Sequence, residues 1–118
     1  MSGIALSGAT RVIAIFGDPI VQVKSPAGVT AALQARGREA VVVPIHVAAD
    51  HVATFVSGVT VARNFDGLIA TIPHKFAAYR LCASATARAH ALAAVNVMRR
   101  NPDGSWHGDM ADGEGFVA

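Results

Sequence analysis

The segment Gly67-Leu-Ile-Ala-Thr-Ile-Pro-His-Lys75 decides how the rest of the chain is interpreted. It lies within a mainly apolar run, residues 65–72, which is typical of a strand buried on both faces. Pro73 ends that run and suits the first position of a helix, because its missing N–H would have no helical partner there. The segment therefore predicts a strand that opens into a helix, and open α/β sheets bind ligands at such junctions.

Two ionisable side chains, His74 and Lys75, stand at the start of this predicted helix. Lys75 is one of two lysines among ten basic residues. An ammonium group, unlike a guanidinium, loses its proton readily once it is desolvated, so Lys75 is a candidate for proton transfer. The alternative is a solvated lysine on a first helical turn, which is the common fate of lysines.

Two more strand–helix units precede this segment. Apolar runs at 12–16 and 40–45 predict buried strands, and apolar residues at helical spacing predict helices between Ser25 and Gly37 and at 52–59. Pro44 cannot donate to a neighbouring strand, which favours an edge position for strand 40–45. Successive strands that each lead into a helix predict parallel βαβ units.

The pattern changes after a short helix predicted at 86–92. Strand-like pieces at 94–100 and 105–109 are joined by Asn101-Pro-Asp-Gly104, a strong turn signal. A hairpin at this position turns one strand antiparallel to its neighbours. The predicted fold is α/β, a three-layer αβα open sheet that is mostly parallel with one antiparallel strand.

Composition excludes several classes of protein. A chain of 118 residues allows one core, and 53% apolar with 15% charged residues indicates a globular protein. No apolar stretch approaches the roughly 20 residues of a membrane span, and no signal peptide is recognisable. With a net charge of +2, scattered arginines and few aromatic residues, nucleic-acid binding is not expected. Cys82 is the single cysteine, so an internal disulfide is excluded and the cytoplasm is the expected compartment.

Three features of the sequence carry no function in this interpretation. Residues 113–118 match a dinucleotide-binding glycine pattern, but the helix and the acid that the pattern requires would lie beyond Ala118, so this lone match is rejected. The histidines lack metal-ligand spacing, since His46 and His51 straddle a strand-to-helix junction, so we expect no metal site. Cys82 is interpreted as a small buried apolar group.

The candidate site residues are predicted to lie at one end of the sheet. Ser25, the segment Thr71–Lys75, Asn96 and Asp112 all follow strands or begin helices, and the carboxyl ends of parallel strands meet at one crevice. Together they supply hydroxyl, amide, ammonium and carboxylate groups, enough to hold a polyhydroxylated small molecule. Lysine and aspartate together are also suited to passing a proton at a carbinol carbon. Taken singly, each residue has an alternative role as a helix cap or a strand-end hydrogen-bonding group.

These residues fall within four motifs that occur in a fixed order over residues 17–116. The motifs are G-x-P-I-x-x-S-x-S-P, matched by Gly17, Pro19, Ile20, Ser25 and Pro26; G-x-N-V-T-x-P-x-K, matched by Gly67, Thr71, Pro73 and Lys75; G-A-V-N-T, matched by Ala94, Val95 and Asn96; and G-x-N-T-D-x-x-G-F, matched by Gly108, Asp112, Gly115 and Phe116. On these motifs the chain resembles the N-terminal, substrate-binding domain of the shikimate dehydrogenase family.

The resemblance implies an oxidoreductase that oxidises a ring hydroxyl of shikimate, quinate or a related hydroxy acid with NADP or NAD. It implies Lys75 and Asp112 as catalytic residues, with Ser25, Thr71, Asn96 and Asp112 holding the carboxylate and hydroxyls of the substrate. The cofactor would bind to a downstream domain that these residues do not include, so the chain alone is expected to be inactive.

The same resemblance divides the chain into three parts. Residues 1–11 are expected to form a lead-in and residues 12–110 the substrate-binding domain. Residues 111–118 are then the start of a helix that leads towards the nucleotide-binding domain.

Five apolar residues stand where the family has polar ones. They are Val23, Ile69, Val97, Met110 and Ala111. Each lost neutral hydrogen bond costs about 0.5–1.5 kcal/mol, and each one to a carboxylate about 1.5–3 kcal/mol. These departures suggest a divergent member that prefers a less polar or differently substituted substrate.

Two alternatives remain open from the sequence. One is a stand-alone module that binds a small hydroxy acid without catalysis. The other is an unrelated receiver-like or scaffold domain of the same α/β class.

Overall fold

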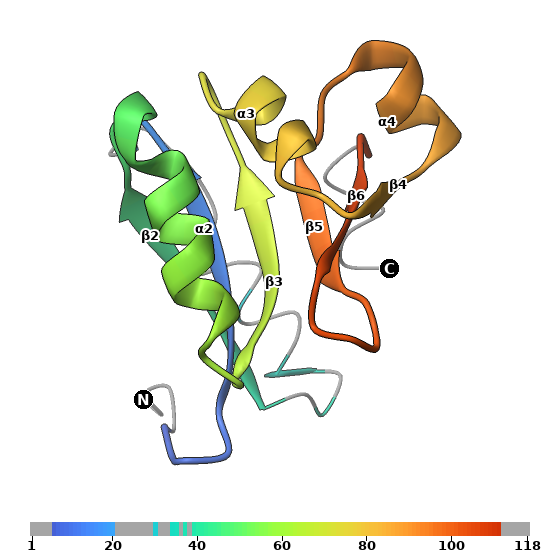
Figure 1. Cartoon of the computed structure of the whole chain (residues 1–118). Helices are drawn as coiled ribbons and strands as arrows, with labels where there is room; N and C mark the ends of the chain where they lie inside the picture. The colour runs from blue at the N-terminus through green and yellow to red at the C-terminus, as the bar shows by residue number, and fades with distance from the viewer. Residues whose placement is uncertain (1–5, 21–29, 31–33, 36, 38, 112–118) are drawn as a thin grey trace.

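A single mixed sheet organises the molecule (Figure 1). The structure, a computed structural model, describes residues 6–20, 30, 34–35, 37 and 39–111. Within these residues the sheet has six strands in the order β2-β1-β3-β5-β6-β4. The strands are β1 (Arg11–Gly17), β2 (Ala40–His46), β3 (Phe65–Ala70), β4 (Ser84–Ala85), β5 (Val97–Arg100) and β6 (Trp106–Asp109). The helices are the 3₁₀ turn η1 (Ala49–His51), α2 (Val52–Thr60), α3 (Lys75–Arg80) and α4 (Ala87–Leu92).

The strand directions confirm the predicted fold class. β1 pairs in parallel with both β2 and β3, and β4 pairs in parallel with β6. β5 runs antiparallel to both of its neighbours, β3 and β6. β2, which contains Pro44, lies at one edge of the sheet. An edge strand pairs on one side only, so the N–H that Pro44 lacks need not cost a hydrogen bond between strands.

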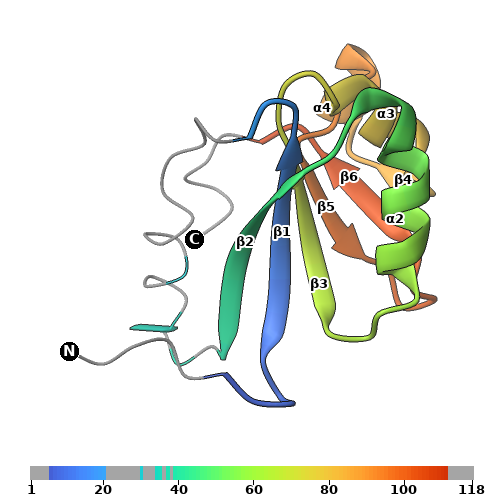
Figure 2. The ribbon, with the colours of Figure 1, turned by 90° about the vertical axis from the view of Figure 1, so that its left-hand side faces the viewer.

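Each face of the sheet carries its own apolar cluster. Figure 2 shows α2, α3 and α4 on one side of the sheet, where Phe16, Leu68 and Met98 are fully buried against helix residues. The opposite face buries a second cluster around Ile13, Ile15 and Val42.

The helix predicted between Ser25 and Gly37, which would supply the third layer, lies largely outside the described residues. Its Thr30 is buried and accepts a hydrogen bond of 2.8 Å from the backbone of Val42 in β2. None of the helices that the structure describes is long and apolar enough to cross a membrane.

Two predicted boundaries were wrong at the central segment. β3 ends at Ala70 instead of residue 72, and α3 begins at Lys75, so Pro73 is not the first helical residue. Pro73 lies in a turn, preceded by a cis peptide bond, that is closed by a 2.8 Å hydrogen bond from His74 N to Thr71 O. This local bond captures the Thr71 carbonyl, so the chain turns before the helix starts.

The C-terminal hairpin was predicted, with small differences. Its strands are shorter than expected, because the backbone N–H of Val95 bonds to Lys75 O instead of joining a ladder. The short strand β4 was missed, since two residues carry no periodic signal. The turn at Asn101–Gly104 is present, and Gly104 has a φ of 90°, a conformation that favours glycine.

Candidate active site

The turn after β3 is bonded directly to the end of β1. Thr71 N donates to Phe16 O at 2.9 Å, and Asp18 N donates to Ile72 O at 3.1 Å. These two bonds continue the β1–β3 pairing past the end of β3 and fix where the Thr71 side chain stands. The sheet therefore presents Thr71 at the carboxyl ends of its parallel strands, where such folds bind ligands.

Gly17 makes this close approach possible. A Cβ atom built on Gly17 would lie 2.3 Å from Thr71 Cγ2 and 3.1 Å from Ile72 O. Contacts between carbon atoms are ordinary at about 3.5–4.0 Å, so any larger residue would displace the turn. The requirement for glycine here comes from its missing side chain and not from an unusual φ.

His74 belongs to the core. It is 1% exposed, its ring stacks on Phe16 at 5.9 Å between centroids, and its Nε2 bonds to the carbonyl of Val47. Because a carbonyl only accepts, Nε2 carries the proton. His74 therefore anchors the first turn of α3, and the two ionisable side chains suggested by the sequence have different roles.

Lys75 is half-buried as the first residue of α3. Its backbone carbonyl accepts a hydrogen bond of 2.9 Å from Val95 N, which ties α3 to the segment before β5. Within the described part of the chain its ammonium group has no hydrogen-bonding or ionic partner. The group is thus available to a ligand or to a residue beyond the described set.

Asn96 lies beside the same turn. Its backbone carbonyl accepts from Ala70 N at 2.9 Å, and its backbone N–H donates to Asp109 O at 3.0 Å. Its side-chain amide contacts Ala111, the residue before Asp112. Thr71, Lys75 and Asn96 therefore share one end of the sheet, whereas Ser25 and Asp112 lie outside the described residues.

Two features at this end of the sheet were not singled out from the sequence. Asp18 Oδ1 and His46 Nε2, at the ends of β1 and β2, lie 2.6 Å apart. Ile72 and Phe76, on either side of Lys75 along the chain, are 68% and 59% exposed. Phe76 was expected only as a helix residue, and no pattern distinguishes an exposed phenylalanine from a buried one in so short a helix.

The strand register partly explains the apolar residues that stand at polar positions of the family motifs. Ile69 and Val97 are direct partners across the β3–β5 pair. Ile69 packs against the cluster around Ile15 on the face opposite the helices, and Val97 is buried. Met110 packs against the other cluster, on the helix side of the sheet. These three side chains therefore make apolar contacts within the fold.

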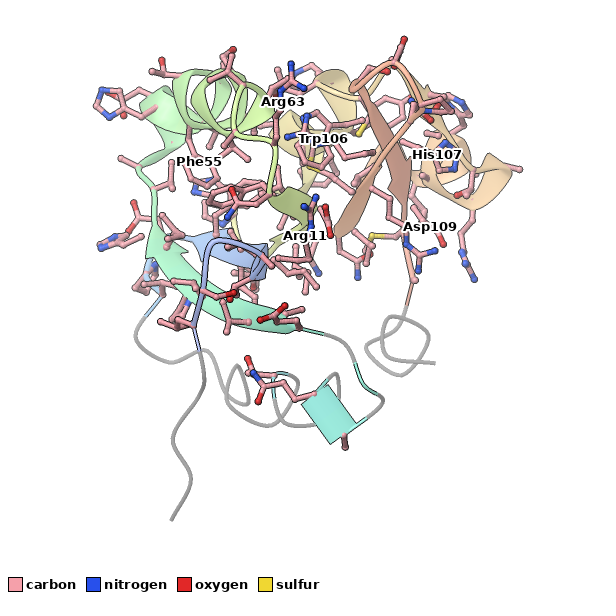
Figure 3. The ribbon with its side chains drawn as sticks, turned by 90° about the horizontal axis from the view of Figure 1, so that it is seen from below. Arg11, Phe55, Arg63, Trp106, His107 and Asp109 are labelled. Carbon is pink, nitrogen blue, oxygen red and sulfur yellow. The ribbon has the colours of Figure 1, made fainter. Side chains whose placement is uncertain are left out.

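Two concave regions are lined by residues other than Thr71, Lys75 and Asn96. One, of about 760 Å³, is lined by residues that include Arg11, Arg63 and Asp66 at the opposite end of the strands, the end that Figure 3 views. Two of its charges are paired with each other, because Arg11 donates to both carboxylate oxygens of Asp66.

The second concave region, of about 160 Å³, lies beside Arg99, His107 and Asp109. Asp109 accepts a hydrogen bond from Thr86 and two from Arg88, and these lower its pKa. Among the described residues no group of three histidine, cysteine or acidic side chains is arranged to hold a metal ion.

Comparison with known proteins identifies relatives over almost the whole chain. The family described as shikimate dehydrogenase substrate binding domain matches residues 15–98. A shikimate dehydrogenase (NADP(+)) from Synechococcus sp. (strain JA-3-3Ab) is 41% identical over 112 residues, which cover 95% of this chain and 38% of that relative.

Solved structures give the same result. A shikimate 5-dehydrogenase from Thermus thermophilus, in complex with shikimate, superposes with a TM-score of 0.79 at 26% identity, over 91% of this chain and 40% of that one. A 5-ketofructose reductase of Gluconobacter sp. strain CHM43, in its ligand-free form, superposes with a TM-score of 0.81 at 26% identity, over 91% of this chain and 38% of that one.

The chain spans about 38% of the length of this Synechococcus relative. The family match covers β3 and the turn after it, α3 and the first half of β5. An unrelated receiver-like or scaffold domain is therefore excluded. This chain belongs to the family of shikimate dehydrogenase substrate binding domains.

Proposed function

We propose that this chain is the substrate-binding half of an NADP-dependent dehydrogenase that oxidises a ring hydroxyl of shikimate, quinate or a related hydroxy acid. The main support is the family match, together with the position of the Lys75 amine near the carboxyl ends of the parallel strands, where such folds bind ligands. Residues 12–110 form the substrate-binding domain in this proposal, and residues 111–118 begin the connection to a nucleotide-binding domain. The proposed compartment is the cytoplasm, in keeping with the single, unpaired Cys82.

In the proposed reaction, Lys75 and Asp112 handle the proton of the substrate hydroxyl. Lys75 in its neutral form accepts this proton, and the Asp112 carboxylate stabilises the ammonium group that forms. Bound NADP⁺ supplies the acceptor for the hydride that leaves the carbinol carbon. Ser25, Thr71 and Asn96 hold the carboxylate and the remaining hydroxyls, which fixes the ring relative to Lys75.

The polar groups of the described residues suit a substrate-binding domain that does not itself bind the cofactor. The described residues at the ligand end offer a hydroxyl, an amide and an amine, which suit a hydroxy acid. They do not include a glycine-rich turn between a strand and a helix of the kind that cradles a pyrophosphate. We therefore propose that the cofactor binds to a domain beyond these residues. NADP is proposed over NAD because the Synechococcus relative is named a shikimate dehydrogenase (NADP(+)).

The substrate is proposed to be shikimate or a differently substituted hydroxy acid. Since Ile69, Val97 and Met110 make contacts inside the fold, they bear less on ligand choice than their positions in the motifs suggested. Val23 and Ala111 remain as the departures that bear on it. A stand-alone binding module has less support, because the named relative is a dehydrogenase.

The test is a dehydrogenase screen of the full-length protein against shikimate, quinate and simpler hydroxy acids, with NADP⁺ and with NAD⁺. Lys75→Ala is expected to lower kcat by about 10²–10⁴-fold, the usual contribution of a general acid–base group. Arg80→Ala removes a cation from the exposed far end of the same helix and serves as the matched control. Retained turnover in Lys75→Ala would remove this residue from the mechanism.

A further inference from the structure

His74 is a buried residue that takes no part in the proposed reaction, although it directly precedes Lys75. It is the N-cap residue of α3, yet its side chain makes no capping hydrogen bond to that helix. N-cap side chains commonly accept a hydrogen bond from the first helical turn. The ring of His74 instead donates through Nε2 to the carbonyl of Val47, outside the helix. The start of α3 is therefore held from the neighbouring loop.

The bond to Val47 links α3 to the ends of two parallel strands. Val47 follows β2, is buried, and donates its N–H to Gly17 O at the end of β1 at 3.0 Å. The residue before Gly17, Phe16, accepts a hydrogen bond of 2.9 Å from Thr71 N. Thr71 O in turn accepts from His74 N at 2.8 Å. These bonds form a closed circuit that leaves His74 through its ring and returns to it through its backbone.

Thr71 and Lys75 depend on this circuit to different degrees. The turn at Thr71 has its own bonds to β1, because Thr71 N donates to Phe16 O and Ile72 O accepts from Asp18 N. Outside α3, the described structure gives the backbone of Lys75 one hydrogen bond, from Val95 N at 2.9 Å. Its second attachment is the residue before it, His74. Loss of the bond from the His74 ring should therefore move Lys75 more than Thr71.

We propose that His74 is a positioning residue for Lys75, which it holds at the carboxyl ends of the parallel strands through the bond from Nε2–H to the carbonyl of Val47. This inference rests on the proposed function, in which Lys75 handles the substrate proton, and it adds a role for the buried histidine. A positioning residue acts through its partner, so its effect disappears when the partner is removed. It should change kcat more than KM, because other residues bind the substrate.

Two substitutions separate the ring of His74 from its hydrogen bond. His74→Phe keeps an aromatic ring against Phe16 and removes the donor, which leaves the carbonyl of buried Val47 unpaired. A misplacement of about 1 Å costs on the order of 10²-fold in rate, so His74→Phe is expected to lower kcat by about 10–100-fold, with KM changed by less than about 3-fold. His74→Gln places an amide N–H near the position of Nε2 and is expected to keep kcat within about 5-fold of native.

The test is a double-mutant cycle with Lys75→Ala, measured as kcat on the full-length enzyme. His74→Phe is expected to reduce kcat strongly in the native background and by less than about 2-fold in the Lys75→Ala background. Val59→Ala controls for lost stability, since it removes buried volume at the C-terminal end of α2 and should leave kcat within about 2-fold of native. If His74→Phe does not fold, His74→Asn tests the same loss, because its amide stops short of the position of Nε2.

Amide hydrogen exchange supplies a readout that does not depend on turnover. Ala78 N bonds to His74 O, and Val95 N bonds to Lys75 O, both at 2.9 Å. These two amides should exchange faster in His74→Phe than in His74→Gln or Val59→Ala, while the Thr71 amide keeps its protection.

The outcomes separate this inference from the proposed function. Additive losses in the cycle, native kcat in His74→Phe, equal losses in His74→Phe and His74→Gln, or unchanged exchange of Ala78 and Val95 would overturn the inference and leave the proposed function intact. Full turnover in Lys75→Ala would instead count against the proposed function, and against the route by which His74 acts.

Discussion

Replacing Gly17 with alanine tests the contact that places Thr71 at the end of β1. The added methyl group would lie 2.3 Å from Thr71 Cγ2. Since the ordinary separation of two carbon atoms is at least about 3.5 Å, the overlap exceeds 1 Å. A second contact, 3.1 Å to Ile72 O, hinders relief by moving the backbone, because that carbonyl is bonded to Asp18 N.

The overlap sets the expected magnitudes. Overpacking of this kind costs about 1–3 kcal/mol of unfolding free energy. Displacement of Thr71 by about 1 Å should also lower kcat/KM by roughly 10²-fold if its hydroxyl contacts the substrate as proposed. Gly58→Ala is the matched control: Gly58 lies exposed inside α2, where an added Cβ would meet nothing within 4 Å, so this change should stabilise by about 0.5–1 kcal/mol.

Two assays separate the effects. Urea unfolding followed through Trp106, the single tryptophan, gives the free energy, and steady-state kinetics of the full-length enzyme give kcat/KM. A Gly17→Ala variant that unfolds at the native midpoint and keeps native kcat/KM would refute the expected overlap. A loss of stability with unchanged kcat/KM would show that the turn absorbs the methyl group without moving Thr71.

Three further predictions concern residues outside the proposed site. Arg100 donates to the carbonyls of residues 59, 60 and 62 at the end of α2, and to those of residues 65 and 104. Arg100→Ala should therefore lower the free energy of unfolding in urea by about 2–4 kcal/mol, whereas Arg99→Ala, at an exposed position, should change it by less than about 0.5 kcal/mol. Similar losses in the two variants would show that these hydrogen bonds of Arg100 do not stabilise the fold. Burial raises the pKa of the Cys82 thiol to about 11, so iodoacetamide at pH 8 should modify it roughly 10²-fold more slowly than a free cysteine, and labelling at the free rate would refute the burial. The pKa of Asp109 is lowered chiefly by the Thr86 hydroxyl, so its stabilisation is present above about pH 4 and is lost as pH falls through the lowered pKa; Asp109→Asn should flatten this acid dependence, and an unchanged profile would contradict it.

The strands and the hairpin were predictable because their signals are local. Each of the first three strands is a run of apolar residues, and the turn at residues 101–104 has the residues that such turns require. No comparable signal exists for the turn at Pro73, since a proline at a first helical position and a proline in a turn before a helix look alike in sequence. The outcome is decided by the bond from His74 to Thr71 and by burial of the His74 ring on Phe16.

The contacts around Asn96 could not be predicted for a different reason. Its side-chain partner, Ala111, lies 15 residues further on and meets it only because the β5–β6 hairpin has a particular register. A motif can suggest that an asparagine at this position matters, but it does not say whether the amide faces a ligand or a peptide.

The register of the β3–β5 pair changes the meaning of two departures from the family pattern. Ile69 and Val97 were each interpreted as the loss of a polar group near the ligand, with an energetic cost for each. As direct partners across β3 and β5 they form one apolar pair, in which Ile69 packs against the cluster around Ile15 and Val97 is buried. Replacing both members of a polar pair with apolar groups is nearly neutral, whereas replacing one leaves its partner unsatisfied. The two changes therefore act together as an adjustment within the sheet, and differences in substrate preference should be sought at Val23 and Ala111.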